Sequence, residues 1–280
     1  MATGARRALR DDPRPGLEGM GRLLVSLEKV RAHDGLMIPL GVYQPTSGKQ
    51  GSGPLPVLVI FHGGPAESSP VGWDPFVRFY TSLGYAVVEP NIRGSTGFGR
   101  AYEKADDREK RGDAIQDVAT VNAWVKAQPW ADPGRVIIMG ASYGGYLTLM
   151  GLTRQPSLWR AGVDLVGVAD LPTLLRSTDQ GLRAVLVDEF GDVDKDAALL
   201  DAYSPSRDVD KVTAPLFVYA GQNDPRVPRA QSDAIVVALR RHGTPVEYMV
   251  AANEGHSLDR RENRIELMTR VARFLGDHAR

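Results

Sequence analysis

Six short apolar runs alternate with longer segments of helical character from residue 57 onward, and this alternation limits the folds open to the chain. The runs are Val57–Phe61, Tyr85–Val88, Val136–Met139, Gly162–Val168, Leu216–Ala220 and Val246–Val250. The helical segments are Trp73–Leu83, Ala114–Ala127, Tyr143–Arg154, Ala230–His242 and Ser257–Leu275. Strands of a parallel sheet are covered on both faces, so they are continuously apolar and are joined by helices. The pattern predicts an α/β fold with a mostly parallel central sheet and helices on both faces.

Two regions depart from this alternation. Residues 1–20 are rich in Arg, Pro and Gly and predict an N-terminal arm, and residues 170–210 hold short amphipathic pieces that predict a cap-like insertion. Two β-rich runs between Arg22 and Tyr43 flank a turn at His33-Asp34-Gly35, which predicts a hairpin of antiparallel N-terminal edge strands. A length of 280 residues, 42% of them hydrophobic, favours one large domain over residues 21–280.

Charge and cysteine content exclude several classes of protein. Thirty-four basic residues balance thirty-four acidic ones, so the net charge does not indicate binding to nucleic acid or to an anionic membrane. Without cysteine the chain has no disulfide, thiolate metal site or thiol nucleophile. The N-terminus lacks the apolar core of a secretory signal, and no apolar run approaches the roughly 20 residues of a membrane-spanning helix. We expect a cytoplasmic protein, unless a leader has been removed.

A candidate nucleophile follows the third of the apolar runs. Gly140-Ala141-Ser142-Tyr143-Gly144 fits the pattern G-x-S-x-G and lies between a predicted strand and a predicted apolar helix. This strand-turn-helix context is what a nucleophile elbow requires, because the serine takes a strained backbone conformation between small neighbours. The N–H groups at the start of the helix then face the reaction centre. An ordinary glycine-rich turn is the alternative, but the context favours Ser142 as the nucleophile of a serine hydrolase.

The donors of an oxyanion hole are expected after the first parallel strand and after the nucleophile. The first strand ends in Phe61-His62-Gly63-Gly64-Pro65, which is similar to the H-G-G-x element of esterases. The backbone N–H groups of Gly64 and Tyr143 are the predicted donors. We expect His62 to hold this turn by hydrogen bonds rather than to act in catalysis.

The partners of the serine are expected on the last two strand ends. Of the five histidines, only His256 follows the last strand and precedes the final helix, where the loop would carry a general base. Asp224 lies in the loop Gly221–Pro228 after the preceding strand, and would orient His256 through Nδ1. An Asx turn before Pro225 is the alternative role for this aspartate. The chain order Ser142, Asp224, His256 is the order of α/β-hydrolases.

At this point the chain resembles the catalytic α/β-hydrolase domain of the prolyl oligopeptidase family, in particular its acylaminoacyl-peptidase branch. The resemblance runs from about Val57 to Leu275, and rests on H-G-G-P (62–65), N-I-R-G-S-T-G-F-G (91–99), G-A-S-Y-G-G-Y (140–146), S-P (204–205), G-Q-N-D-P-R-V-P (221–228) and E-G-H (254–256). It implies the same triad and the same oxyanion donors. It also implies that Arg226 binds substrate, with a salt-bridging loop arginine as the alternative.

The chain departs from that family at its N-terminal end. Only about 55 residues precede the first parallel strand, too few for the β-propeller that restricts family peptidases to short peptides. Without that gate we expect the 170–210 insertion and the 91–103 loop to shape the pocket, with Phe98 and Tyr102 forming an apolar acyl site. In this the chain resembles stand-alone esterases that use the same catalytic domain, and we expect a carboxylesterase that acts on short or aryl acyl esters.

Two alternatives stay open: a serine peptidase that releases acylated or apolar amino acids from short peptides, and a non-catalytic binding module. The predicted partner is a small-molecule ester or a short peptide, and the chemistry requires no metal and no cofactor. The family's association through sheet edges makes the early hairpin a candidate interface for a homo-oligomer.

Overall fold

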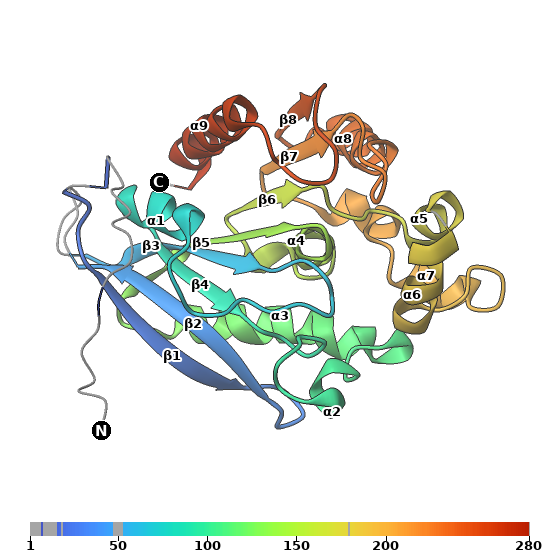
Figure 1. Ribbon diagram of the computed structural model, residues 1–280, viewed down its shortest axis with the longest axis horizontal. Helices are drawn as coiled ribbons and strands as arrows, with labels where there is room; N and C mark the ends of the chain where they lie inside the picture. Colours follow the sequence, from blue (N-terminus) through green and yellow to red (C-terminus); the bar gives the residue numbers. More distant parts are fainter. Residues whose placement is uncertain (1–6, 8–15, 18, 47–52, 179, 280) are drawn as a thin grey trace.

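The computed structural model describes residues 7, 16–17, 19–46, 53–178 and 180–279. These residues form one eight-stranded sheet in the order β1-β2-β4-β3-β5-β6-β7-β8 (Figure 1). β1 and β2 pair antiparallel, β2 joins β4 antiparallel, and the pairs from β4 to β8 are parallel. The strands are β1 Leu23–Arg31, β2 Met37–Pro45, β3 Leu55–Phe61, β4 Ala86–Pro90, β5 Ala131–Ala141, β6 Ala161–Leu165, β7 Leu216–Gly221 and β8 Val246–Ala251. The predicted fold class, with its antiparallel edge hairpin, is confirmed.

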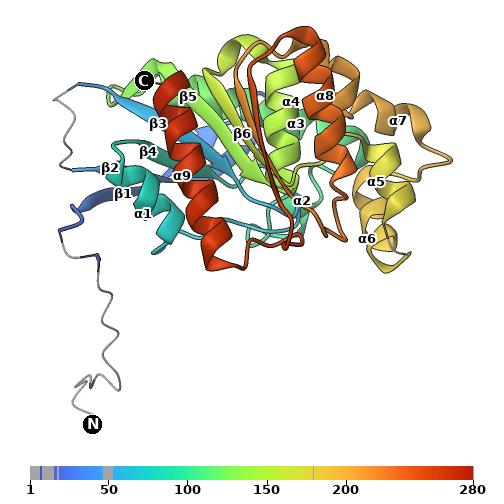
Figure 2. The ribbon, with the colours of Figure 1, turned by 90° about the horizontal axis from the view of Figure 1, so that it is seen from above.

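Helices cover both faces of the sheet (Figure 2). α1 (Pro75–Ser82) and α9 (Arg261–His278) pack on one face, and α3 (Arg111–Lys126), α4 (Tyr143–Arg154) and α8 (Ala230–His242) pack on the other. The central strands are therefore buried on both sides, which is why they are continuously apolar. α4 is the most enclosed helix of the five, because it packs against β3, β5 and β6 together.

The crossover from β6 to β7 carries several short helices beyond the carboxyl ends of the strands. α5 (Leu171–Ser177), α6 (Gln180–Phe190) and α7 (Ala197–Ala202) gather at the right of Figure 1, and the 3₁₀ helix η3 (Pro205–Lys211) follows them and packs against α4 and α8. Short helical segments also precede α3 and β6: α2 (Arg100–Glu103), η1 (Arg108–Lys110) and η2 (Pro156–Leu158). The segment predicted as an insertion thus lies at the strand ends that carry Ser142 and its partners.

Several predicted boundaries differ from the observed ones, and the two largest differences lie at the starts of β5 and α9. β5 begins at Ala131, because its start pairs with Leu55 of β3 before the ladder shifts register at Val57. α9 begins at Arg261 rather than at Ser257, since the preceding loop is held in a non-helical form by the side chain of Glu254. The predicted N-terminal arm falls mostly outside the described residues. No helix in the described ranges combines the length and the apolar character needed to cross a membrane.

Candidate active site

Ser142 lies at the sharp turn between β5 and α4. Its backbone has φ 56° and ψ −115°, a left-handed conformation that L-residues rarely adopt and that stores strain. The turn is possible because Gly144 lets α4 approach β3 closely. A Cβ on Gly144 would meet the carbonyl oxygen of Phe61 well inside van der Waals contact. The two glycines of the motif, Gly140 and Gly144, also pack directly on each other.

Ser142, His256 and Asp224 form a hydrogen-bonded series, although they are far apart in sequence. Ser142 Oγ lies 3.0 Å from His256 Nε2, and His256 Nδ1 lies 2.7 Å from Asp224 Oδ2. An ionised carboxylate can only accept, so Nδ1 carries the proton. Nε2 is then unprotonated in the neutral ring and is able to accept the proton of Ser142. The Asp224 side chain is 1% exposed, which keeps water out of this bond.

Separate hydrogen bonds hold the loops that carry the acid and the histidine. Asp224 Oδ1 accepts from the backbone N–H groups of Arg226 (2.8 Å) and Val227 (2.9 Å). The predicted Asx turn and the predicted bond to His256 therefore coexist, one on each carboxylate oxygen. In the histidine loop, Glu254 accepts from the N–H of Arg260 at 2.9 Å and from Asn263 Nδ2 at 2.7 Å.

The side chain of Glu254 is ionised and holds this loop by hydrogen bonds. Its side chain is buried, which opposes ionisation, but hydrogen bonds from Asn263 and from the backbone of Arg260 and Asp259 lower its pKa below the ordinary value. A charged acceptor makes stronger hydrogen bonds than a neutral one. The carboxylate thus fixes the path of residues 254–260, and with it the position of His256.

The two predicted oxyanion donors, Gly64 and Tyr143, line the same part of the surface as Ser142. Tyr143 is the first residue of α4, so its N–H has no acceptor within the helix. Gly64 has φ 119°, a conformation that favours glycine, and lies in the loop after β3. This loop lies against Ser142, since a Cβ on Gly63 would lie 3.7 Å from Ser142 Cβ.

His62 holds the same loop. Its Nδ1 donates to the carbonyl oxygen of Gly63 at 2.7 Å, and its Nε2 lies 2.8 Å from Ser95 Oγ. Burial lowers the pKa of His62, which favours the neutral ring. One ring nitrogen is thus bonded within the turn and the other to the loop after β4, as is expected of a histidine that holds the turn.

Two hollows lie beside the Ser142–His256 pair. The small hollow has a volume of about 90 Å³ and is lined by Gly64, Ser142, Tyr143, Tyr146, Val168, Leu174, Leu182, Leu186, Phe190, Arg226 and Val227. The large hollow has a volume of about 420 Å³, and its lining includes Gly63, Ala141, His256 and Leu258 together with residues of α1, β4 and α9. The small hollow therefore borders the serine, and the large hollow borders the histidine.

The structure places the three predicted substrate-binding residues differently. Arg226 lines the small hollow. Phe98 and Tyr102 instead pack on each other with ring centres 5.4 Å apart, and the Tyr102 hydroxyl donates to the carbonyl oxygen of Asn91. Neither ring lines either hollow in the part of the chain that the structure describes. The apolar wall beside Ser142 comes from α6 and its neighbours, not from the 91–103 loop.

The sequence contains a pattern that indicates this wall. Leu182, Leu186 and Phe190 follow one another at intervals of four residues, which puts them on one face of a helix.

The burial of Arg111, by contrast, could not be predicted from the sequence, because this residue lies in a run of charged residues. Its side chain is only 1% exposed.

A buried ion cluster joins Tyr143 to the end of α6. Arg111 donates to Asp106, to the Tyr143 hydroxyl at 2.5 Å and to Glu189 Oε2 at 3.3 Å. Its guanidinium carbon also lies 4.6 Å from the ring centre of Phe190, in range of a cation–π interaction. The cluster therefore connects Tyr143, the residue after Ser142, with the helix that forms a wall of the small hollow.

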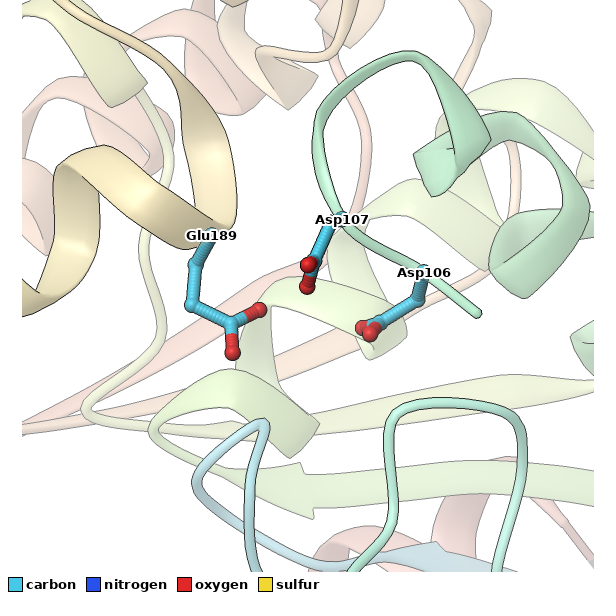
Figure 3. Close-up of side chains that lie close together, drawn as sticks. All are labelled: Asp106, Asp107 and Glu189. Carbon is cyan, nitrogen blue, oxygen red and sulfur yellow. The ribbon is translucent and has the colours of Figure 1, made fainter. Parts of the chain in front are cut away.

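Three carboxylates of this region point toward one another, and their oxygens lie close enough to share a metal ion (Figure 3). They belong to Asp106, Asp107 and Glu189, and each of them already pairs with a side-chain cation. Arg111 forms ion pairs with Asp106 and Glu189. Lys104 Nζ lies 3.4 Å from Asp107 and 4.0 Å from Glu189. Burial also raises the pKa of Asp106, and raises that of Glu189 to about 7. We assign the three carboxylates to the ion cluster and not to a metal site.

Comparisons with known proteins agree with this geometry. Residues 74–280 match the model of the prolyl oligopeptidase family. The chain is 38% identical to dipeptidyl aminopeptidase BIII of Pseudoxanthomonas mexicana over 215 residues, which is 75% of this chain and 31% of that protein. It is 29% identical to the human acylamino-acid-releasing enzyme over 231 residues, 80% of this chain and 31% of that protein.

A solved structure of a puromycin-hydrolysing peptidase from Mycobacterium tuberculosis superimposes with a TM-score of 0.90 and 26% identity. The match covers 99% of this chain and 43% of that one. The chain thus spans about a third of the length of the curated relatives that it matches.

Proposed function

The chain belongs to the prolyl oligopeptidase family, and from this premise we propose that it is a serine peptidase that cleaves amide bonds of short peptides after an apolar residue. The observation that carries the proposal is the series Ser142–His256–Asp224, with distances of 3.0 and 2.7 Å, beside an apolar hollow. The named relatives are peptidases, which favours this reading over the carboxylesterase interpretation of the sequence.

Acyl transfer would proceed in two steps. His256 Nε2 takes the proton of Ser142 as Oγ attacks the substrate carbonyl carbon, and Asp224 stabilises the resulting imidazolium. The protonated His256 then gives its proton to the departing amine, which leaves an acyl-enzyme ester on Ser142. Water, activated by the same histidine, releases the acyl group.

The negative charge on the carbonyl oxygen would be held by the N–H groups of Gly64 and Tyr143. Both are backbone donors fixed before the reaction, one in a rigid turn and the other at the first residue of α4. Fixed donors cost little reorganisation during the reaction, and loss of one typically lowers kcat by roughly 10²- to 10³-fold. The positive end of the α4 dipole supports the same charge.

The small hollow would bind the side chain on the acyl side of the cleaved bond, because it borders Ser142 and both donors. We further propose that residues 170–210 act as a cap, since Leu174, Leu182, Leu186 and Phe190 supply most of its apolar wall. Among the described residues that line it, the cation is Arg226 and there is no carboxylate. A cation suits the carbonyl oxygen of an N-acyl group better than it suits a free ammonium group.

Three substrates with the same apolar residue test the proposal: N-acetyl-Phe p-nitroanilide, Gly-Phe p-nitroanilide and N-acetyl-Phe p-nitrophenyl ester. We expect kcat/KM for the acetylated anilide to exceed that for the free-amine anilide, with measurable anilide turnover. Ester turnover without anilide turnover would restore the esterase reading. Preference for Gly-Phe would contradict the role given to Arg226.

Two control variants separate catalysis from binding. Ser142→Ala is expected to lower kcat on the order of 10⁶-fold, as when a triad serine is removed. Leu186→Ala should lower kcat/KM for the acetyl-Phe anilide about tenfold, because it removes apolar contact in the small hollow. Val185→Ala changes the neighbouring residue, which is 62% exposed, and should have little effect. Equal losses in the two α6 variants would exclude the small hollow as the acyl site.

A further inference from the structure

We propose that the large hollow is the subsite for the leaving group, and that it selects amines with an apolar body and a cationic end, such as a lysine or arginine residue after the cleaved bond. This inference rests on the proposed peptidase function. It adds the chemical nature of the part of the substrate that leaves as an amine, which the names of the relatives do not specify.

The position of His256 assigns the large hollow to the leaving group. In acyl transfer the departing nitrogen takes its proton from the histidine Nε2, so the leaving group must lie next to that atom. His256 lines the large hollow together with Ser257 and Leu258 of its own loop. Gly63 and Ala141 continue the same wall up to the nucleophile. The small hollow lies on the Tyr143 side and is not lined by His256.

The size and walls of the large hollow suit a long side chain. Its volume of about 420 Å³ falls in the range of roughly 300–1,000 Å³ that is usual for ligand pockets. Most of the wall is apolar or aromatic, formed by Ile60, Phe76, Val77, Tyr80, Met139, Leu165, Val166, Tyr219, Leu258 and Leu267. Such a wall contacts the methylene groups of a lysine or arginine side chain.

Two carboxylates give the large hollow its charge preference. Glu89 is the fourth residue of β4, and Asp74 is the N-cap of α1, where its Oδ1 accepts the N–H of Phe76 at 2.7 Å. Both residues line the hollow. The one cationic residue among the described lining residues is Arg264, an exposed residue of α9. The α1 and β4 side of the hollow is therefore acidic.

Glu89 is well suited to respond to a cation. Burial raises its pKa to about 7; a hydrogen bond from Tyr43 opposes this rise, and the nearby carboxylate of Asp74 adds to it. A cation placed beside Glu89 would favour its ionised form, because an opposite charge within a few ångströms stabilises the carboxylate. A basic side chain bound in the hollow would supply that opposite charge.

The reverse of the acylation step allows the binding of an amine in this subsite to be measured. An amine bound in the large hollow can attack the acyl-enzyme in place of water, so that its nitrogen forms a bond to the acyl carbon and the bond from that carbon to Ser142 Oγ breaks. The proton leaving the nitrogen passes through His256 Nε2 to Ser142 Oγ. The ratio of amide to free acid in the products then reports how well each amine occupies the leaving-group subsite, independently of how the acyl-enzyme formed.

The experiment forms the acyl-enzyme from N-acetyl-Phe p-nitrophenyl ester and adds either lysinamide or norleucinamide. The two nucleophiles have similar straight side chains, and only that of lysine carries an ammonium group. We expect lysinamide to give about tenfold more Nα-acyl product than norleucinamide at equal concentration, the scale of a hydrogen-bonded charge pair. Product ratios are measured by chromatography, after subtraction of the reaction without enzyme.

Two isosteric variants test the carboxylates. Glu89→Gln should reduce the lysinamide advantage to about onefold to twofold. Asp74→Asn should reduce it partly and keep α1 intact, since asparagine caps a helix as well as aspartate does. Glu28→Gln removes one negative charge from an exposed position on β1 and should leave the ratio unchanged. Circular dichroism and thermal unfolding of each variant establish that it is folded.

The outcomes distinguish this inference from the proposed function. Equal interception by the two amines in the unaltered enzyme would overturn the charge preference, while hydrolysis of the ester and anilide would still support a serine peptidase. An unchanged advantage in both Glu89→Gln and Asp74→Asn would overturn the role of these carboxylates. Absence of any acyl-enzyme with the ester would instead contradict the proposed function itself.

Discussion

At the scale of single residues, the carboxylate of Asp224 has two tasks: one oxygen bonds to His256 and the other holds its own loop. Oδ2 lies 2.7 Å from His256 Nδ1, and Oδ1 accepts two backbone N–H groups of its own loop. The sequence presented these tasks as alternatives, because an aspartate before proline is typical both of an Asx turn and of a triad loop. Only the three-dimensional structure shows that the two bonds use different oxygens.

Asp224→Asn is expected to separate these tasks. The amide oxygen can still accept from Arg226 and Val227, while the amide nitrogen would face His256 Nδ1 and force the wrong tautomer. We expect kcat to fall about 10⁴-fold, as for a triad aspartate replaced by asparagine, with little change in melting temperature. Steady-state kinetics and thermal unfolding measure the two effects.

Asp224→Ala serves as the matched control for this prediction. It removes both oxygens, so it should lose activity and also lower the melting temperature, because two loop N–H groups lose their acceptor. Equal melting temperatures for the asparagine and alanine variants would contradict the structural task assigned to Oδ1.

At the scale of elements, the positions of most strands and helices were predictable, and the walls of the site were not. The apolar runs predicted the positions of β3 to β8, because a parallel strand that is buried on both faces is continuously apolar whichever strands lie beside it. The order of the strands brought Ser142, Asp224 and His256 to one edge. The wall formed by α6 was not foreseen residue by residue, since the 3.6-residue pattern says that a helix has an apolar face but not what that face covers.

The contact between α4 and β3 gives a prediction at this scale. Gly144→Ala would place a methyl group against the backbone carbonyl of Phe61, and neither backbone can move without displacing an element. We expect a loss of more than about 3 kcal/mol in the free energy of unfolding, at the upper end of overpacking effects. We also expect a large fall in kcat/KM, because a displaced α4 moves the Tyr143 N–H away from the reaction centre.

Gly72→Ala is the control, since a Cβ there meets no atom within 4 Å. Its unfolding free energy should change by less than about 0.5 kcal/mol, as for ordinary surface substitutions. Urea unfolding of both variants measures the difference. A Gly144→Ala enzyme with unchanged stability would mean that α4 does not need this close approach.

At the scale of the whole molecule, a single acid in the middle of the sheet links global stability to pH. Asp164 on β6 pairs in register with Gly140 of β5 and Val218 of β7, and its side chain is fully buried against Gly145 and Gly167. Neither carboxyl oxygen has a partner with full hydrogen-bond geometry among the described residues. Burial raises the pKa of Asp164 to about 8, although the nearby backbone N–H of Gly167 partly opposes the rise, so the folded protein holds this proton at neutral pH.

The direction of the pH effect follows from proton linkage. Between the ordinary aspartate pKa of 3.8 and the folded pKa of about 8, the folded state binds one proton more than the unfolded state. The contribution of Asp164 to stability is therefore fully present below the unfolded pKa and is lost as pH rises through the window, by at most about 1.4 kcal/mol per pH unit.

Asparagine has the same shape as aspartate and does not titrate. The unfolding free energy of Asp164→Asn minus that of the unaltered protein should therefore increase from pH 5 to pH 7. Groups common to both proteins, such as Glu89, cancel in this difference. Guanidinium unfolding at three pH values measures it, with the exposed Asp194→Asn as a control that should give a flat difference. A flat difference for Asp164→Asn as well would mean that Asp164 is ionised in the folded sheet. The unpartnered carboxyl group would then need a counter-charge that the described residues do not supply.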